Sequence, residues 1–256
     1  LKVVTKLESR YAAFDGLNLT WETLEGLAKH NGPVRRPTGW LVEYDKRHPL
    51  DLDTHASAEA QVAAIADDIA YNNHDLDDGI RARVFTLEEA VELPLIGEAW
   101  AEARAAHPAM PRDRAITETV RRVINRMIQD VVDEAGRRIA ALVPRSAQDI
   151  RAAGQPVIAF STDMQLANQA IREFLFTRMY RHWRVNRAMQ KSKRVSQMLF
   201  QLLHGGPQML PPEWQARAGE AGSTQCAQLV CDYIAGMTDR FALEEYKRLT
   251  DPNIPG

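Results

Sequence analysis

Three polar side chains within one apolar stretch have the types and the spacing to bind a cation or a polar ligand. The stretch, residues 58–79 (AEAQVAAIADDIAYNNHDLDDG), is rich in alanine, valine and isoleucine in its first half, and it contains Asp67, Tyr71 and Asp75. At about 100° per residue of helix, these three positions spread over roughly 80° of surface and can face one pocket. An ionised carboxylate is costly to bury alone. The aspartates therefore indicate a bound cation, a hydrogen-bonding ligand or a salt bridge, and helix-to-helix hydrogen bonding is the alternative.

The element that must position these residues is a helix beginning after the N-cap residue Ser57. Apolar residues occur on all sides of its first half, which is typical of a buried helix rather than an amphipathic surface helix. The acidic turn from Asp75 to Gly79 is expected to end it. The sequence therefore predicts a buried helix with carboxylates set into it.

A second set of chemical residues lies between about Asp163 and His204, where the sequence predicts one or two helices. On one continuous helix, His182 lies about 40° from Arg178, and several apolar residues lie within roughly 60° of it. Arg178 and His182 are therefore expected on the apolar face. In that position they need either a bound anion or buried salt bridges to core acids. A phosphate is an anion that suits the planar fork of arginine. The apolar residues are Ile171, Phe174, Leu175, Val185 and Met189.

The other side of the same segment carries a stripe of basic residues. Such a stripe is typical of a solvated face, and it can also bind an anionic partner such as nucleic acid or a neighbouring subunit. Both interpretations stay open at this point. The stripe consists of Arg181, Arg184, Arg187, Lys191 and Arg194.

Composition is ordinary for a globular protein, with 256 residues, 45% hydrophobic and 26% charged. The formal net charge of -2 demands no polyanionic partner. Cys226 and Cys231 have a spacing that fits neither a disulfide framework nor a zinc site, so we expect reduced core thiols in a cytoplasmic protein. No run approaches the roughly 18 apolar residues of a membrane span. A soluble protein without a membrane partner is predicted.

Helical periodicity extends along most of the chain and predicts an all-α fold. Residues 113–142 show apolar residues at steps of three and four, and a further helix is expected at about 223–249. Only residues 156–160 hint at a strand. Glycine-rich phosphate loops, Ser/His/Asp arrangements and CxxC pairs are absent from the sequence, which excludes kinase, Rossmann, esterase and zinc-ribbon classes.

Four segments resemble the bacterial deoxyguanosine triphosphate triphosphohydrolases and dGTPase-like proteins, which are HD-domain enzymes. The resemblance spans nearly the whole chain and implies an HD-domain-like multi-helix bundle with a helical C-terminal extension. It implies a single region over residues 1–256, with 1–90 as the remainder of the HD core and 91–256 as a helical C-terminal portion. The segments are LNLTWETLEGLAKHNGP (17–33), EAQVAAIADDIAYNNHDLDDGIRA (59–82), FLFTRMYRHWRV (174–185) and DYIAGMTDRFAL (232–243).

The reaction that the resemblance implies is cleavage of a deoxynucleoside triphosphate (dNTP) to the deoxynucleoside and tripolyphosphate. A divalent metal, Mg²⁺ or Mn²⁺, is held in this family by a His, a His-Asp pair and a final Asp. Asp67 matches that final Asp, while Tyr71 and Asp75 match residues that contact the deoxyribose and its 3′-hydroxyl. Arg178 and His182 resemble an R-x3-H motif directed at the substrate.

Lys29 and His30 correspond by the same resemblance to a phosphate-contacting pair. Their other interpretation is electrostatic, since basic residues at the end of a helix complement its dipole. Residues 1–14 already run at helical period, so the chain is expected to be part of a longer protein. The family's other metal ligands and its catalytic His precede the segment where this chain begins. We therefore identify no catalytic residue and expect the chain alone to be inactive.

The dipeptide His74-Asp75 spells HD, yet it occupies the sugar-contacting turn of the family pattern and is not assigned to the metal. The resemblance also suggests a homo-oligomer, and single-stranded DNA or a dNTP as a possible effector. Two other functions stay open. One is a non-catalytic oligomerising or nucleic-acid-binding HD relative that uses the basic stripe, and the other is an HD nucleoside monophosphate phosphohydrolase.

Overall fold

Helices form the regular structure throughout the part of the chain that the computed structural model describes, residues 1–254. Among these residues no strand occurs, and pairing of the β type is limited to isolated bridges in the first sixteen residues. The predicted all-α fold is confirmed. Residues 156–160, which alone hinted at a strand, form an irregular loop.

The chain divides into two compact units, unit 1 at Leu1–Tyr180 and unit 2 beginning at Arg181. This boundary is drawn from the packing between residues. The division near residue 90 is drawn from the family resemblance instead, and it stays a prediction.

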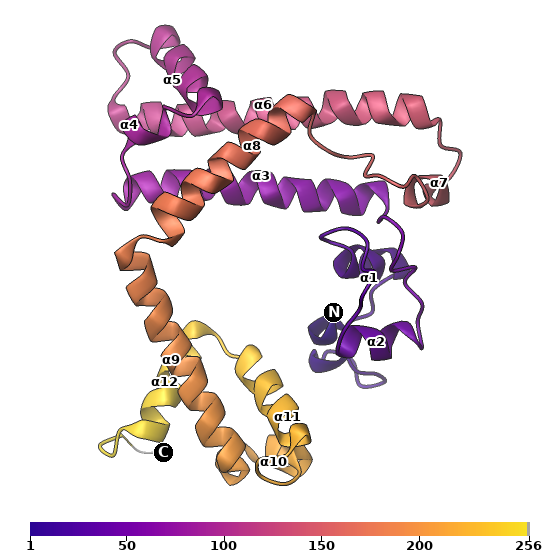
Figure 1. Cartoon of the computed structure of the whole chain (residues 1–256). Coiled ribbons are helices and arrows are strands. Elements are labelled where there is room, and N and C mark those ends of the chain that lie inside the picture. The colour runs from indigo at the N-terminus through magenta and orange to yellow at the C-terminus, as the bar shows by residue number, and fades with distance from the viewer. Residues whose placement is uncertain (255–256) are drawn as a thin grey trace. The chain divides into compact units, whose positions relative to one another are not determined.

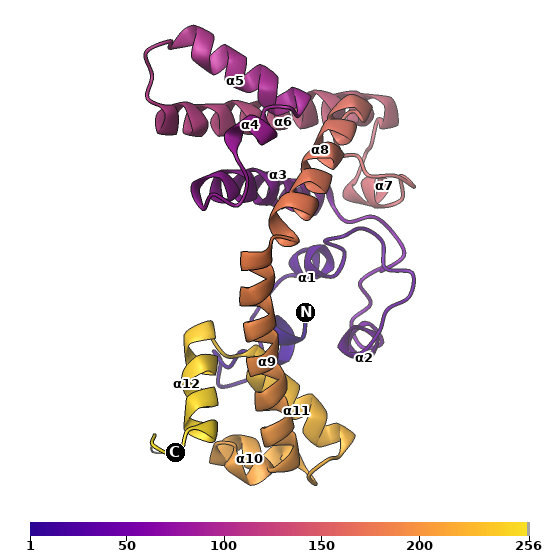
Figure 2. The same ribbon diagram turned by 60° about the vertical axis from the view of Figure 1, so that its left-hand side comes forward.

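Two long helices form the centre of unit 1, α3 (Ala58–Arg81) and α6 (Arg112–Leu142). Helix α5 (Pro94–Ala106) packs along the N-terminal part of α6, and α8 (Thr162–Leu175) runs across α3 (Figures 1 and 2). The apolar period of residues 113–142 does place one face of α6 in the core. The core between these helices includes Ile69, Leu76, Val123, Met127, Ile171 and Leu175.

Short elements complete unit 1, and several of them begin at a residue whose side chain caps the N-terminal turn. Thr20 accepts a hydrogen bond from the backbone N–H of Thr23, and Thr86 with Glu89 forms a full capping box. The elements are η1 (Val3–Leu7), α1 (Trp21–Ala28), α2 (Trp40–Asp45), α4 (Leu87–Ala90), α7 (Ala147–Arg151) and η2 (Phe176–Tyr180).

A buried ionic cluster joins α1 to α7. Glu25 and Lys29 have fully buried side chains, and the Lys29 Nζ lies 2.9 Å from the Glu25 carboxylate. Arg151 donates to both oxygens of the same carboxylate at 2.9 and 3.1 Å, and it packs over the Trp21 ring. Burial alone would raise the pKa of Glu25, but the hydrogen bonds and charges of Arg151 and Lys29 outweigh it and lower that pKa below its ordinary value. The cluster therefore holds a charged carboxylate in the core.

The expectation that α3 is buried on all sides is wrong for its first half. Val62, Asp67 and Asp68 are exposed, and the buried residues of the helix begin only at Ile69. The physical reason is that the contacts of this half come from α1, which packs against α3, and from the loop before α8, where the Val157 and Ile158 backbone N–H groups donate to Gln61. Small apolar side chains on every side permit burial but do not require it.

The segment expected between 163 and 204 consists of two helices with an interruption. Helix α8 passes into the π-helix η2 at Phe176, and a turn at residues 181–182 precedes α9 (Trp183–Gly205). Angles computed for one continuous helix therefore do not hold across residue 180. Arg178 is exposed rather than set in an apolar face, which corrects that expectation.

Unit 2 packs α9 against α11 (Thr224–Ala235) and α12 (Asp239–Thr250). Its remaining elements are η3 (Pro207–Met209) and α10 (Pro212–Ala218). The single helix expected at 223–249 is two helices, separated at Gly236. Both cysteines are free thiols, but only Cys226 is in the core, and the expectation of a buried Cys231 is wrong. No described helix combines the length and apolar composition that crossing a membrane requires.

Candidate functional site

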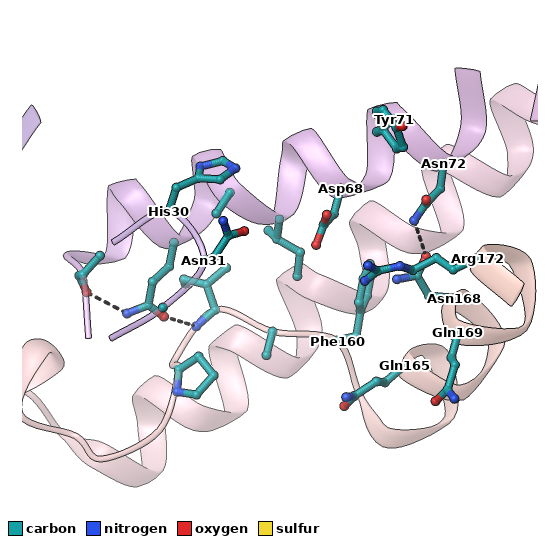
Figure 3. A pocket seen from close by; sticks show the side chains of 18 of the residues that line it. His30, Asn31, Asp68, Tyr71, Asn72, Phe160, Gln165, Asn168, Gln169 and Arg172 are labelled. Carbon is teal, nitrogen blue, oxygen red and sulfur yellow. Dashed lines mark hydrogen bonds between the residues drawn. The ribbon is translucent and has the colours of Figure 1, made fainter. Parts of the chain in front are cut away.

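Helices α3 and α8 form two walls of a pocket of about 1280 Å³ in unit 1, which the end of α1 and the loop before α8 complete (Figure 3). The volume is above the usual range for pockets that bind small molecules, so a nucleotide-sized ligand fits. Helix α3 contributes Asp68, Tyr71 and Asn72. The pocket is thus built from the stretch that first indicated chemistry.

A polar face of α8 lines the opposite wall, with residues spaced by three, four and seven positions, which places them on one side of the helix. Asn72 donates a hydrogen bond of 2.9 Å from its amide to Asn168, and this bond joins the two walls. Both asparagines are buried. The pocket-lining residues of this face are Gln165, Asn168, Gln169 and Arg172.

Arg172 is the cation of this polar face, and Figure 3 shows its side chain directed from α8 into the pocket. Within residues 1–254 it forms no ion pair with a carboxylate. A guanidinium in a pocket without a carboxylate partner is suited to an anionic ligand, above all a phosphate. Arg172 was not among the residues predicted from the sequence, although the polar spacing along α8 could have indicated it.

Asp67 and His30 lie beside each other, with the His30 Nε2 3.5 Å from the Asp67 carboxylate. Both side chains are largely exposed, and His30 also lines the pocket. Imidazole and carboxylate are common ligands of divalent metals. In the described part of the chain, however, no three histidine, cysteine or acidic side chains are grouped closely enough to hold a metal ion. The pair can therefore supply two ligands but is not a metal site by itself.

Tyr71 and Asp75 are joined by a residue that sequence reasoning missed, Tyr180. Its hydroxyl donates a hydrogen bond to the Asp75 carboxylate. Burial, followed by the hydrogen bonds with Asp75 and Tyr71, raises the pKa of the Tyr180 phenol above its ordinary value. This tyrosine therefore stays protonated and links α3 to η2. It belongs to the segment FLFTRMYRHWRV, in which the sequence assigned it no role.

The other predicted residues lie outside this polar pocket or are already engaged. Arg178 forms an ion pair with Glu89 at 2.6 Å. His182 is the N-cap of α9, where its Nδ1 accepts from the Arg184 backbone N–H at 3.3 Å. Lys29 lines the pocket, but its Nζ is bonded to Glu25, to the Thr54 hydroxyl and to a backbone carbonyl. Their roles toward a substrate stay predictions.

Residues 158–248 match the model of the phosphohydrolase-associated domain. A deoxyguanosinetriphosphate triphosphohydrolase-like protein of Parvibaculum lavamentivorans is 52% identical over the whole chain, which covers 66% of that relative. Proteins of the same description from Caulobacter sp. (strain K31) and Azorhizobium caulinodans are 51% and 50% identical over 97% and 98% of the chain, which covers 64% and 66% of them. The chain thus spans just under two thirds of these relatives' length.

The helical fold, the polar pocket and these matches define a member of a phosphohydrolase family. Within it, the chain belongs to the deoxyguanosinetriphosphate triphosphohydrolase-like proteins of the HD superfamily.

Proposed function

We propose that this chain provides the substrate pocket of a metal-dependent dNTP triphosphohydrolase, which converts dGTP or another dNTP to the deoxynucleoside and tripolyphosphate. The observation that carries the proposal is the pocket between α3 and α8, with a free guanidinium on one wall and a tyrosine on the other. The descriptions of the relatives support the same reaction. The activity belongs to a form that spans the relatives' whole length, called the full-length form below.

Each wall of the pocket has a separate task in this proposal. Tyr71 and Tyr180 line the pocket, and Asp75 is reached from it through its hydrogen bond with Tyr180. In the proposal, Tyr71 and Asp75 orient the deoxyribose, with the Asp75 carboxylate as acceptor for the 3′-hydroxyl. Arg172 binds the phosphates through its planar fork. Holding both ends of the nucleotide fixes the phosphorus that is attacked, which lowers the entropic part of the barrier.

Asp67, with His30 beside it, is proposed as a ligand of a divalent metal, Mg²⁺ or Mn²⁺. When bound, such an ion polarises a phosphoryl oxygen and lowers the pKa of a coordinated water. In this chain the pair lies at the end of α1 and on α3, near the pocket wall that carries Asp68 and Tyr71. The remaining ligands are expected from the part of the relatives that this chain does not span.

A product assay tests the function. The full-length form is incubated with dGTP and with each other dNTP in the presence of Mn²⁺ or Mg²⁺, and the products are separated by ion-exchange chromatography. We expect equimolar tripolyphosphate and deoxynucleoside, and no product when a chelator is present. Release of inorganic phosphate from dGMP, with dGTP left intact, would instead support an HD nucleoside monophosphate phosphohydrolase.

The residues of helix α9 support a second candidate function, the binding of nucleic acid. The exposed Trp183 lies at its start, with the guanidinium carbons of Arg184 and Arg187 at 5.4 and 5.6 Å from its ring centroid. Lys191 and Arg194 lie on the same side of the helix, and within the described residues these four cations form no ion pair. An exposed aromatic ring among cations can stack a base while the cations contact phosphates.

Salt dependence of binding tests this candidate. We expect the chain to bind fluorescently labelled single-stranded DNA with an affinity that falls steeply with salt, with a logarithmic slope of about -0.7 per phosphate neutralised. The double variant Arg187→Glu and Arg194→Glu should reduce that slope, whereas Arg240→Glu, on exposed α12, should leave it unchanged. Equal effects of both variants, or binding insensitive to salt, would contradict a specific role of α9.

A further inference from the structure

Gln61 faces the pocket from the first turn of α3, yet its side-chain amide is bound to backbone atoms of two other segments. Its Nε2 donates a hydrogen bond of 2.8 Å to the carbonyl of Ala56, which lies just before α3. Its Oε1 accepts hydrogen bonds from two consecutive backbone N–H groups, those of Val157 and Ile158, at 2.9 and 3.1 Å. Both ends of one amide group are therefore engaged, and each end holds a loop that lines the pocket. Gln61 with these three hydrogen bonds is called the Gln61 clamp below.

The loop of residues 156–160 needs such a clamp because it is irregular and buried. Val157, Ile158 and Phe160 are 2, 9 and 7% exposed, so the backbone between them is withdrawn from water. Buried N–H groups require an acceptor within the protein. A helix or a sheet would supply one through its own backbone, but this loop has neither. The side chain of Gln61 supplies the acceptor for two N–H groups of the loop instead.

The same loop leads directly into α8, the pocket wall opposite α3. At its first residue, the Pro156 carbonyl accepts a hydrogen bond of 2.8 Å from Arg138 of α6. At its end, the backbone N–H of Ser161, the N-cap of α8, donates to Asp130 of α6 at 2.9 Å, and the Ser161 hydroxyl donates to the same carboxylate. Helix α6 thus fixes both ends of the loop, whereas Gln61 ties its middle to α3. The start of α8 is therefore held from two helices.

We propose that Gln61 is a positioning residue of the pocket, which sets the start of α8 against α3 and thereby aims Arg172 at the ligand. Gln61, Asp68 and Asn72 are spaced by seven and four positions and line the pocket from one face of α3. Further along this face, Asn72 is bonded to Asn168 of α8. The Gln61 clamp and the asparagine bond are thus two separate ties between the walls. Loss of the clamp leaves α8 attached at one point only, around which it can tilt.

The chemistry of the clamp requires an amide side chain. Glutamine presents a donor and an acceptor in one planar group, and here the donor holds the loop before α3 while the acceptor holds the loop before α8. Methionine has a similar length but supplies neither an N–H donor nor a carbonyl oxygen, and an ionised glutamate supplies only acceptors. This inference deepens the proposed function and rests on it for its effect on turnover, but the clamp itself can be tested without a substrate.

Amide hydrogen exchange of the full-length form, read by mass spectrometry at single residues, tests the clamp. Gln61→Met should speed the exchange of the Val157 and Ile158 N–H groups at least about tenfold, because both lose their acceptor. Gln61→Glu should exchange more slowly than Gln61→Met, since a carboxylate oxygen accepts the same bonds. Gln129→Met is the matched control, because Gln129 forms an exposed hydrogen bond within α6, to Asp133. Equal exchange in the unmodified form and Gln61→Met, or in the two Gln61 variants, would overturn the clamp.

Steady-state kinetics of the full-length form tests whether the clamp positions the pocket. Gln61→Met should raise the KM for dGTP about tenfold or more, because a displacement of about 1 Å in a positioned group can cost up to about 100-fold. Loss of folded protein alone would lower the apparent kcat and leave KM unchanged, so the two constants separate positioning from a purely structural role. Gln129→Met should change neither constant.

A KM that stays unchanged in Gln61→Met would overturn the positioning role. The failure of the proposed function has a different signature, since the unmodified full-length form would then release no tripolyphosphate from any dNTP. In that case, the exchange rates of the Val157 and Ile158 N–H groups still decide whether Gln61 holds the loop before α8.

Discussion

Replacing Asp67 by alanine is expected to abolish the release of tripolyphosphate by the full-length form. Asp67 is exposed, its one recorded polar contact among residues 1–254 is with His30, and it is proposed to ligate the divalent metal. Since a metal contributes several kcal/mol to the stabilisation of a reacting phosphoryl group, the loss should be about 10³-fold or more in kcat/KM. The rate is measured by ion-exchange separation of the products at saturating Mn²⁺.

A direct readout of metal binding separates this role from a structural one. Electron paramagnetic resonance of free Mn²⁺ should show affinity weakened by at least about 100-fold in the variant, since outer-shell changes alone cost up to that factor. Asp78→Ala, an exposed change further along α3, should keep activity and metal affinity. Turnover retained in Asp67→Ala would remove Asp67 from the metal site.

Replacing Glu25 by alanine is expected to give the largest loss of stability. The change leaves the buried Lys29 ammonium and Arg151 guanidinium without their shared carboxylate. Breaking one member of a buried ionic group typically costs about 3–5 kcal/mol, a large share of a domain's total stability. The free energy of unfolding is measured by urea denaturation. Glu92→Ala, at an exposed residue, should change it by less than about 0.5 kcal/mol.

The same carboxylate predicts how stability depends on pH. The pKa of Glu25 is lower in the folded chain than in the unfolded one. Its stabilising contribution is therefore fully present above the unfolded pKa of about 4.3, and it is lost as pH falls through the lower, folded pKa. Glu25→Gln should accordingly flatten the acid limb of the stability curve. An acid limb unchanged in Glu25→Gln would show that other carboxylates control it.

Local sequence patterns were sufficient for most of the fold. The period of α6, the Thr20 cap and the capping box of Thr86 with Glu89 all depend on residues within a few positions of each other. The exposure of Val62 on α3 was missed because composition shows which faces can be buried, not which faces a neighbour covers. The interruption after Tyr180 was missed because apolar spacing continues across it.

The sequence predicted only part of the candidate site, because it does not show which side chains of distant elements meet. Tyr71 of α3 lines the pocket, and its role toward a substrate stays a prediction. Arg172 was missed because it stands among polar residues of α8, where a cation usually means a solvated face. The partnership of Asp75 with Tyr180 joins side chains that are distant in sequence, and a single sequence contains no signal for such a pairing.

The hydrogen bonds between distant parts of unit 1 have a consequence for how the protein folds. Asn72 and Asn168 are 96 residues apart in sequence, Asp75 and Tyr180 are 105 apart, and Glu25 and Arg151 are 126 apart. Each bond closes a long loop, whereas the helices themselves form from contacts within a few residues. Far-ultraviolet circular dichroism reports those local contacts. Helical content is therefore a poor measure of whether the pocket is assembled, and a preparation with full helicity can still lack the long-range closures that hold α3 to α8.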